Sequence, residues 1–254
     1  MACYIIADLH LQASRPELLQ AFSSFVAALK AGDRLFILGD LFNFFIGLDP
    51  QDEAQNVVRQ VLGQAQERGV DSFFVHGNRD FLLSSREAHS FHMTLLPDTW
   101  VLSHNGTNIL LTHGDDFCSN DLAYQRYKRK VSNRCLQFLF RLLPLWKRRQ
   151  IGHSIRMRSQ EMTRSPEERE LYGVVPATVA EICAYYVEQH AATLFPQRID
   201  YVVHGHIHEF GRHEGECKDL KARLVLGAWG NMLSYCYVDD GGGPVLREEP
   251  LPAV

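Results

Sequence analysis

The sequence lacks the features that mark extracellular, zinc-cage or membrane-spanning proteins. None of its six cysteines forms a C-x-x-C pair, so neither a zinc cage nor a disulfide framework is indicated. No uninterrupted apolar run approaches the ~20 residues of a spanning helix. Residues 1–11 have neither the basic start nor the apolar length of a signal peptide. We therefore expect reduced thiols in a cytoplasmic protein.

Acidic residues are missing from one long segment. Residues 122–160 contain no Asp or Glu, but they contain eleven Lys and Arg. The whole chain has a net charge of −4. Outside residues 122–160 it has 15 basic and 30 acidic residues, which is a net charge of −15. Such a local positive field attracts anions, which could be phosphate groups, acidic lipid or nucleic acid.

The length of 254 residues and the 46% hydrophobic content predict one domain with a large core, over residues 1–254. Strands are expected over residues 4–7, 34–38, 72–75, 99–102, 108–111, 199–203, 223–226, 233–238 and 245–251. Helices are expected over residues 15–30, 54–68, 124–142, 151–161 and 175–190, with Pro144 ending or kinking the third. The early alternation of strands and helices predicts a layered α/β architecture.

Five short polar motifs each follow an apolar, β-prone run. They are Asp8-x-His10, Gly39-Asp40, Gly77-Asn78-Arg79-Asp80, His113-Gly114-Asp115 and His206-x-His208. Taken alone, each has an ordinary structural interpretation, such as a helix cap at Asp40 or a turn at Asn78. Taken together, they supply carboxylate, amide and imidazole donors where an α/β sheet binds ligands. Oxygen and nitrogen donors without thiolate favour Mn²⁺, Fe or Zn²⁺ over Ca²⁺.

The order of these motifs resembles that of the calcineurin-like metallophosphoesterase family. This resemblance implies a four-layer α/β/β/α sandwich and two divalent metal ions, for which we expect Mn²⁺. In the family pattern one ion takes Asp8, His10, Asp40 and His208, and the other takes Asp40, Asn78, His113 and His206.

The segments "ADLHL", "ILGDLF", "HGNRDFLL", "HGDDFC" and "VLGAW" resemble one branch of the family, the UDP-2,3-diacylglucosamine diphosphatases of lipid A biosynthesis. The resemblance implies that water attacks the α-phosphorus and gives UMP and 2,3-diacylglucosamine 1-phosphate (lipid X). The implied catalytic residues are Asp40, Asn78, Arg79, His113 and His206. Arg79 stands where generic family members have His, and would stabilise phosphate charge by a bidentate contact. Its alternative role is a salt bridge with Asp80.

The same resemblance implies a helical lid inserted at residues 119–166. The implied substrate contacts are Asn78, Arg79, Asp121, Tyr124, Ser159, Thr163 and His206. Asp121 could bind the sugar or a loop backbone. The family's lysine in the lid is replaced here near Pro166, and Arg156, Arg158 or Arg164 could supply its charge.

The basic segment has two interpretations. It could form an ordinary amphipathic helix, or it could place the apolar side chains of residues 138–146 among acyl chains while its cations meet lipid phosphates. We expect the second, in a monomer bound peripherally to the cytoplasmic side of a Gram-negative inner membrane, with no nucleic-acid partner.

Two alternative functions remain open. The chain could be a calcineurin-like phosphoesterase that acts on another phosphodiester or nucleotide diphosphate. It could also be a metal-independent, salt-sensitive binder of nucleic acid or membrane. Among the other histidines, we expect His76 and His204 to form hydrogen bonds in the wall of the site.

Overall fold

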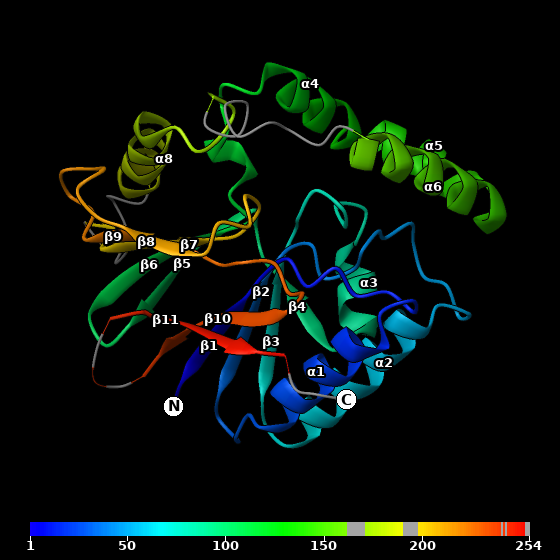
Figure 1. Cartoon of the computed structure of the whole chain (residues 1–254), viewed down its shortest axis with the longest axis horizontal. Helices are drawn as coiled ribbons and strands as arrows, with labels where there is room; N and C mark the ends of the chain where they lie inside the picture. Colours follow the sequence, from blue (N-terminus) through cyan, green and yellow to red (C-terminus); the bar gives the residue numbers. More distant parts are fainter. Residues whose placement is uncertain (162–170, 190–197, 240, 242, 252–254) are drawn as a thin grey trace.

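Two β-sheets form the centre of the computed structural model, which describes residues 1–161, 171–189, 198–239, 241 and 243–251 (Figure 1). One sheet has the strand order β11-β10-β1-β2-β3-β4, and the other has the order β5-β6-β7-β9-β8. The first comprises β1 (Cys3–Ile6), β2 (Arg34–Leu38), β3 (Asp71–Val75), β4 (Met93–Leu95), β10 (Met232–Val238) and β11 (Val245–Pro250). The second comprises β5 (Thr99–His104), β6 (Thr107–Thr112), β7 (Tyr201–His204), β8 (Gly211–His213) and β9 (Ala222–Val225).

Alternating side chains divide the core into layers, because successive residues of a strand point to opposite faces. In β1, Ile6 belongs to a hydrophobic cluster formed with helices α1 (Pro16–Ala27) and α2 (Glu53–Glu67). Its neighbour Ile5 belongs to a second hydrophobic cluster, which lies between the two sheets. In β6, Leu111 faces the first sheet and Leu110 faces the cluster of α8 (Pro176–Gln189). The layers therefore run helix, sheet, sheet, helix, which confirms the predicted α/β/β/α sandwich.

Most predicted elements are present with shifted ends, but the long helix expected over residues 124–142 is wrong. Two helices, α4 (Leu122–Val131) and α5 (Arg134–Leu142), replace it. The side chain of Asn133 accepts hydrogen bonds from the N–H groups of Cys135 (2.9 Å) and Leu136 (3.2 Å), so it starts a new helix. Pro144 ends α5 as expected, and α6 (Leu145–Glu161) follows it. The helix α3 (Ser85–Ser90), β4 and β8 were not predicted.

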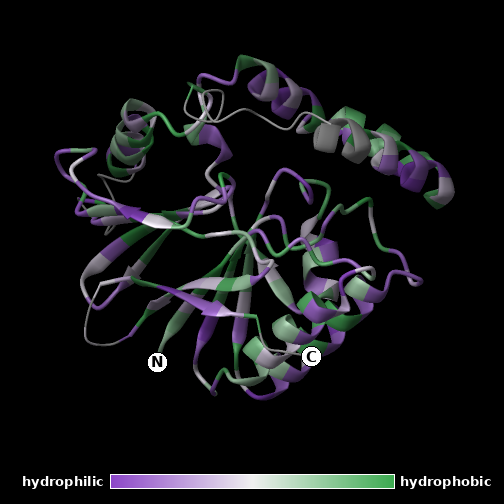
Figure 2. Ribbon diagram, in the orientation of Figure 1, coloured by the Kyte–Doolittle hydropathy of each residue, from purple (hydrophilic) through white to green (hydrophobic). Residues whose placement is uncertain are grey.

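The helices α4, α5 and α6 extend across one side of the sandwich (Figure 1), where apolar and polar segments alternate along their ribbons (Figure 2). Arg149 pairs with Asp49, with Nη2 2.5 Å from Oδ2, and Arg141 pairs with Glu87 at 3.1 Å, so arginines fasten α5 and α6 to the body. Several large apolar side chains of these helices are exposed, namely Leu136, Phe138, Leu139, Leu142, Trp146, Ile151 and Ile155. Among the described helices, none has the length and apolar content needed to cross a membrane.

A buried carboxylate secures the start of β7. Asp200 accepts the backbone N–H of Asn108 (3.0 Å) and pairs with Arg198 (2.7 Å) and Lys221 (3.2 Å). Burial by itself would raise the pKa of Asp200, but the Asn108 hydrogen bond and the two cations hold it below its ordinary value. This strand leads directly into the loop of His206 and His208.

Candidate metal centre

All five polar motifs lie in loops that follow strands β1, β2, β3, β6 and β7. The strands β1, β2 and β3 are parallel neighbours, as are β6 and β7. Their carboxyl ends therefore lie at one edge of each sheet, and the two sheets bring these edges together. The loops are connected by backbone hydrogen bonds from Asp8 to Gly39 (3.2 Å) and from Gly205 to His113 (2.9 Å).

Left-handed backbone conformations concentrate at these loops. Among the described residues other than glycine, positive φ angles occur at Asp8 (56°), His10 (50°), Asp40 (52°), His206 (70°) and His208 (60°), and at two positions elsewhere. Such angles are uncommon for residues with a Cβ atom and cost of order 1–3 kcal/mol each. Five of the seven predicted ligands hold this conformation, which indicates that the fold strains the backbone to orient their side chains.

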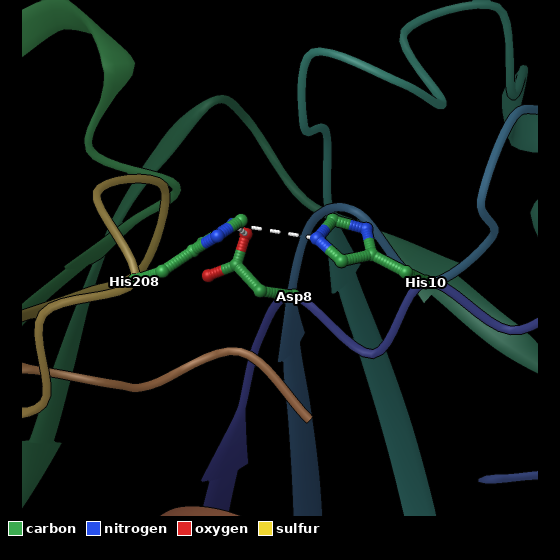
Figure 3. Close-up of side chains that lie close together, drawn as sticks. All are labelled: Asp8, His10 and His208. Carbon is green, nitrogen blue, oxygen red and sulfur yellow. Dashed lines mark hydrogen bonds and ion pairs between the residues drawn. The ribbon is translucent and has the colours of Figure 1, made fainter. Parts of the chain in front are cut away.

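Asp8, His10 and His208 form one group of candidate ligands, and Figure 3 shows their side chains directed toward one another. The Nε2 atoms of His10 and His208 are 3.3 Å apart, and Oδ1 of Asp8 is 3.3 Å from Nε2 of His208. Nδ1 of His10 lies 3.8 Å from Oδ2 of Asp40. Asp40 thus adjoins this group through one oxygen.

Asn78, His113 and His206 form the second group. Oδ1 of Asn78 lies 3.0 Å from Nε2 of His113 and 3.1 Å from Nδ1 of His206. The other oxygen of Asp40, Oδ1, lies 3.8 Å from Nε2 of His113. The seven predicted ligands therefore form two adjoining sets, and Asp40 faces both.

This arrangement fits divalent cations. Donors that bind one ion at about 2.0–2.2 Å lie roughly 3–3.5 Å from one another, which is close to the spacing within each set. Oδ1 of Asp8 and Nδ1 of His10 are buried without a hydrogen-bond partner, a costly state that a bound cation would relieve. Nδ1 of His113 lies 2.9 Å from the carbonyl oxygen of Leu38. Donation to that oxygen would fix the tautomer that directs the Nε2 lone pair into the site.

Burial and neighbouring charges shift the pKa values of several groups in the site. Burial raises the pKa of Asp40 to about 7, with help from the carboxylates of Asp80 and Asp8. Burial opposes protonation of His113, yet Asp40 and Asp8 raise its pKa to about 9. Burial lowers the pKa of His206 to about 3, so this imidazole is neutral and able to coordinate. Cations in the site would take the place of these bound protons.

Arg79 points into the same site. Its Nε lies 3.2 Å from Oδ2 of Asp40, and its Nη1 donates to Oδ1 of Asn43 at 3.1 Å. Its ion pair is thus with Asp40, whereas the sequence alternative paired it with Asp80. The guanidinium adjoins both metal sets, where it can meet a phosphate oxygen.

Asp80 has a different role, which the sequence did not reveal. Its fully buried carboxylate accepts three backbone N–H groups, those of Gly77 (2.9 Å), Asp40 (3.2 Å) and Leu41 (2.8 Å). It therefore joins the Asp40 loop to the Asn78 loop. The four-residue motif Gly77-Asn78-Arg79-Asp80 contained the residue, but only the fold shows what it binds.

His204 and His76 form hydrogen bonds in the wall of the site, as predicted. Nη1 of Arg223 donates a hydrogen bond to Nε2 of His204 at 2.9 Å, while Nδ1 of His204 lies 2.9 Å from the carbonyl oxygen of Gly205. Arg223 in turn pairs with Glu216 through two contacts of 2.7 Å. His76 contacts Asp98 (3.2 Å) and the carbonyl oxygen of Leu83 (2.7 Å).

The predicted substrate contacts are only partly described. Asp121 caps α4 by accepting the Tyr124 N–H at 3.0 Å, a contact within the helix that tests neither of the two roles predicted for it. The Tyr124 hydroxyl donates to Asp115 (2.6 Å), and its ring lies 5.4 Å from that of His206. Ser159 lies within α6. The residues Thr163, Arg164 and Pro166 lie outside the described residues.

A cavity of about 280 Å³ adjoins the second metal set at Asn78. Its apolar walls include Phe81, Tyr127 and Val131, and its charged lining residues are Lys128, Arg134, Asp98 and Asp115. Lys128, a residue that the sequence did not single out, pairs with Asp115 (2.9 Å) and Asp116 (2.6 Å) and so ties α4 to the loop after His113.

Known proteins resemble the chain over nearly its whole length. A "UDP-2,3-diacylglucosamine hydrolase" of Tolumonas auensis is 39% identical over 243 residues, which cover 94% of each chain. A protein of the same name from Histophilus somni is 36% identical over 241 residues, which cover 94% of this chain and 97% of that one. Another from Salmonella paratyphi B is 38% identical over 231 residues, with 90% and 91% covered.

The family model described as "Calcineurin-like phosphoesterase" matches residues 1–210, a span that contains all five loops with candidate ligands. The match agrees with the layered fold and with the shared position of Asp40. The chain therefore belongs to the calcineurin-like phosphoesterase family.

Proposed function

We propose that the chain hydrolyses the diphosphate bond of UDP-2,3-diacylglucosamine in lipid A biosynthesis. The products are UMP and 2,3-diacylglucosamine 1-phosphate. The observation that carries this proposal is the convergence of seven donor side chains into two sets that share Asp40, beside a cavity whose walls combine aromatic and charged side chains. Relatives that match more than 90% of the chain are named "UDP-2,3-diacylglucosamine hydrolase".

Two divalent ions, most readily Mn²⁺, are proposed for the two ligand sets. When bound, such a pair supplies Lewis acidity toward a phosphoryl oxygen and lowers the pKa of water. The first set would comprise Asp8, His10, Asp40 and His208, and the second would comprise Asp40, Asn78, His113 and His206. Mixed oxygen and imidazole donors suit this metal class.

The protein's own groups orient the phosphates. Arg79 is held between Asp40 and Asn43, so its guanidinium is oriented before substrate arrives and can contact two phosphate oxygens as negative charge develops. Asp40 also accepts the Arg79 backbone N–H at 2.9 Å. Attack by water on the α-phosphorus would then expel the 1-phosphate of the acylated sugar.

The cavity at Asn78 is proposed to bind the acylated sugar. The walls formed by Phe81, Tyr127 and Val131 suit acyl chains, and Lys128 and Arg134 suit a sugar phosphate. The helices α4–α6 would act as a lid over this cavity, and Asp121, Tyr124, Ser159 and Thr163 would contact substrate or shape the lid.

The exposed apolar face of α5 and α6 is proposed to contact the cytoplasmic surface of the inner membrane. It presents Leu136, Phe138, Leu139, Leu142 and Trp146 among an excess of cations. Apolar side chains at the interface and cations near lipid phosphates are the two components of peripheral binding. A substrate with two acyl chains would reach the cavity from that surface.

The test is hydrolysis by metal-stripped protein with Mn²⁺ added back. UMP release should depend on metal and should be lost in Asp40→Ala and Asn78→Ala variants, while both variants remain folded. Full activity in either variant would end the proposal. The diacylated substrate should be turned over faster than its deacylated analogue, because only the former fills the apolar cavity. Equal turnover would indicate a phosphoesterase with another substrate.

A further inference from the structure

A second cavity, of about 400 Å³, lies at the loop that follows His10. The side chains that give it its chemistry are Gln12, Asn43, Phe44, Gln51, Glu53 and Arg149. Gln12 follows the ligand His10 by two residues. The backbone N–H of Asn43 donates to the carbonyl oxygen of Leu11 at 3.0 Å, which joins the two loops that form the wall.

This cavity connects to the reacting centre through Asn43. The amide oxygen of Asn43 accepts Nη1 of Arg79 at 3.1 Å, and Nε of Arg79 lies 3.2 Å from Oδ2 of Asp40. The amide nitrogen of Asn43 donates to Oε1 of Gln12. A molecule in the cavity would therefore lie one side chain away from a phosphate held by Arg79.

The two cavities differ in chemistry. The cavity at Asn78 balances two cations, Lys128 and Arg134, against two carboxylates, whereas the one beside His10 contains three amide side chains and three carboxylates with a single cation. Amides provide both donors and acceptors, which suits the edge of a pyrimidine base. Carboxylates accept hydrogen bonds from ribose hydroxyls. Phe44 is half-buried there and offers a ring on which a base can stack.

The lid segment also contributes to this cavity. Arg149 of α6 donates to Oδ2 of Asp49 and, at 3.2 Å, to Oε1 of Gln51. The carboxylates Asp49, Asp52 and Glu53 outnumber this one cation among the lining residues. The cavity thus disfavours a second phosphate and favours an uncharged group, while the phosphates remain with Arg79 and the metal ligands.

We infer that the cavity of Gln12, Asn43, Phe44 and Gln51 binds the nucleoside of the substrate, the uridine of the leaving UMP. This inference rests on the proposed function, since it assigns the two ends of one diphosphate to two cavities, one at Asn78 and one at the loop after His10. The base stacks on Phe44, the amides bind its polar edge, and Glu53 accepts from the ribose.

The test is product inhibition of the Mn²⁺-loaded full chain by three probes: UMP, ribose 5-phosphate and 2,3-diacylglucosamine 1-phosphate. Gln51→Ala should raise the inhibition constant of UMP about 3- to 10-fold, the loss of one or two hydrogen bonds. Phe44→Leu should raise it about 5-fold or more through lost stacking, while leaving ribose 5-phosphate inhibition nearly constant. Both should leave inhibition by the lipid product unchanged.

Two control variants separate this effect from general damage. Gln64→Ala removes an exposed glutamine of α2 away from the cavity, and should change none of the three constants. Gln137→Ala alters the cavity at Asn78. It should weaken inhibition by the lipid product and leave inhibition by UMP unchanged.

The outcomes distinguish the inference from the function. Unchanged UMP inhibition in both Gln51→Ala and Phe44→Leu, with hydrolysis intact, would overturn the nucleoside site and leave the function standing. If the unaltered protein released no UMP from the diacylated substrate, the proposed function would fail and the inference with it. Gln51 is exposed, so its variant gives a result even if Phe44→Leu does not fold.

Discussion

Replacing Asp80 with asparagine should weaken the metal centre without touching any predicted ligand. Oδ1 of Asp80 accepts from Gly77 and Asp40, and Oδ2 accepts from Leu41. An asparagine can keep the first two bonds, but its amide nitrogen would face the Leu41 N–H. One buried N–H group is then left unsatisfied, which costs about 1–3 kcal/mol of unfolding free energy.

The effect on the site should be larger than this loss of stability suggests. Because Asp80 joins the loops of Asp40 and Asn78, the substitution shifts ligands from both metal sets. Loss of a group that orients metal ligands typically lowers metal affinity or activity about 10- to 100-fold. We expect a reduction of this size in Mn²⁺ affinity and in kcat at limiting metal.

The assay pairs Asp80→Asn with Asp33→Asn. Asp33 is also buried and accepts two backbone N–H groups, from Ala2 and Lys30 at 3.0 Å each, but it lies away from the site. Urea unfolding of the metal-free proteins should show similar losses for both variants, whereas Mn²⁺ titration should distinguish them. Equal Mn²⁺ affinity and activity in the two variants would refute the positioning role of Asp80.

Three further predictions follow from other parts of the molecule. In Gly205→Ala the new Cβ would clash with Oδ2 of Asp8, so Mn²⁺ affinity should fall at least about 10-fold. Gly230→Ala is the control, because open space surrounds this residue, and it should bind Mn²⁺ normally. Asp200→Asn should lower the free energy of unfolding by about 1–3 kcal/mol at neutral pH. Because the folded-state pKa of Asp200 is depressed, the difference between the two proteins should shrink as pH falls below about 4. A difference that stays constant in urea unfolding from pH 7 to pH 3 would contradict this prediction. Polar replacement of the exposed apolar residues within 138–146 should reduce co-sedimentation with anionic vesicles, and unchanged binding would exclude them from the membrane contact.

The positions of the candidate ligands were predictable because they follow from local sequence. Each motif comes directly after an apolar β-prone run, and parallel strands end at a common sheet edge, so side chains as distant in sequence as Asp8 and His208 are expected to meet. The alternation of Ile5 and Ile6 between two clusters likewise follows from strand geometry.

The contacts behind the ligands were not predictable, because they depend on how the loops pack. Asp80 meets a backbone N–H about 40 residues earlier, and Arg223 meets His204 across neighbouring strands. The break between α4 and α5 was missed because the apolar spacing continues through it, from Val131 to Cys135, and hides the capping side chain of Asn133. The helix α3 and the strand β4 are too short to show a clear period.

The most direct test of the central claim is anomalous diffraction from a crystal of the chain soaked in Mn²⁺. The account predicts two anomalous peaks about 3.5–4 Å apart, one among Asp8, His10 and His208, the other among Asn78, His113 and His206, with Asp40 between them. A single peak, or peaks away from Asp40, would contradict it.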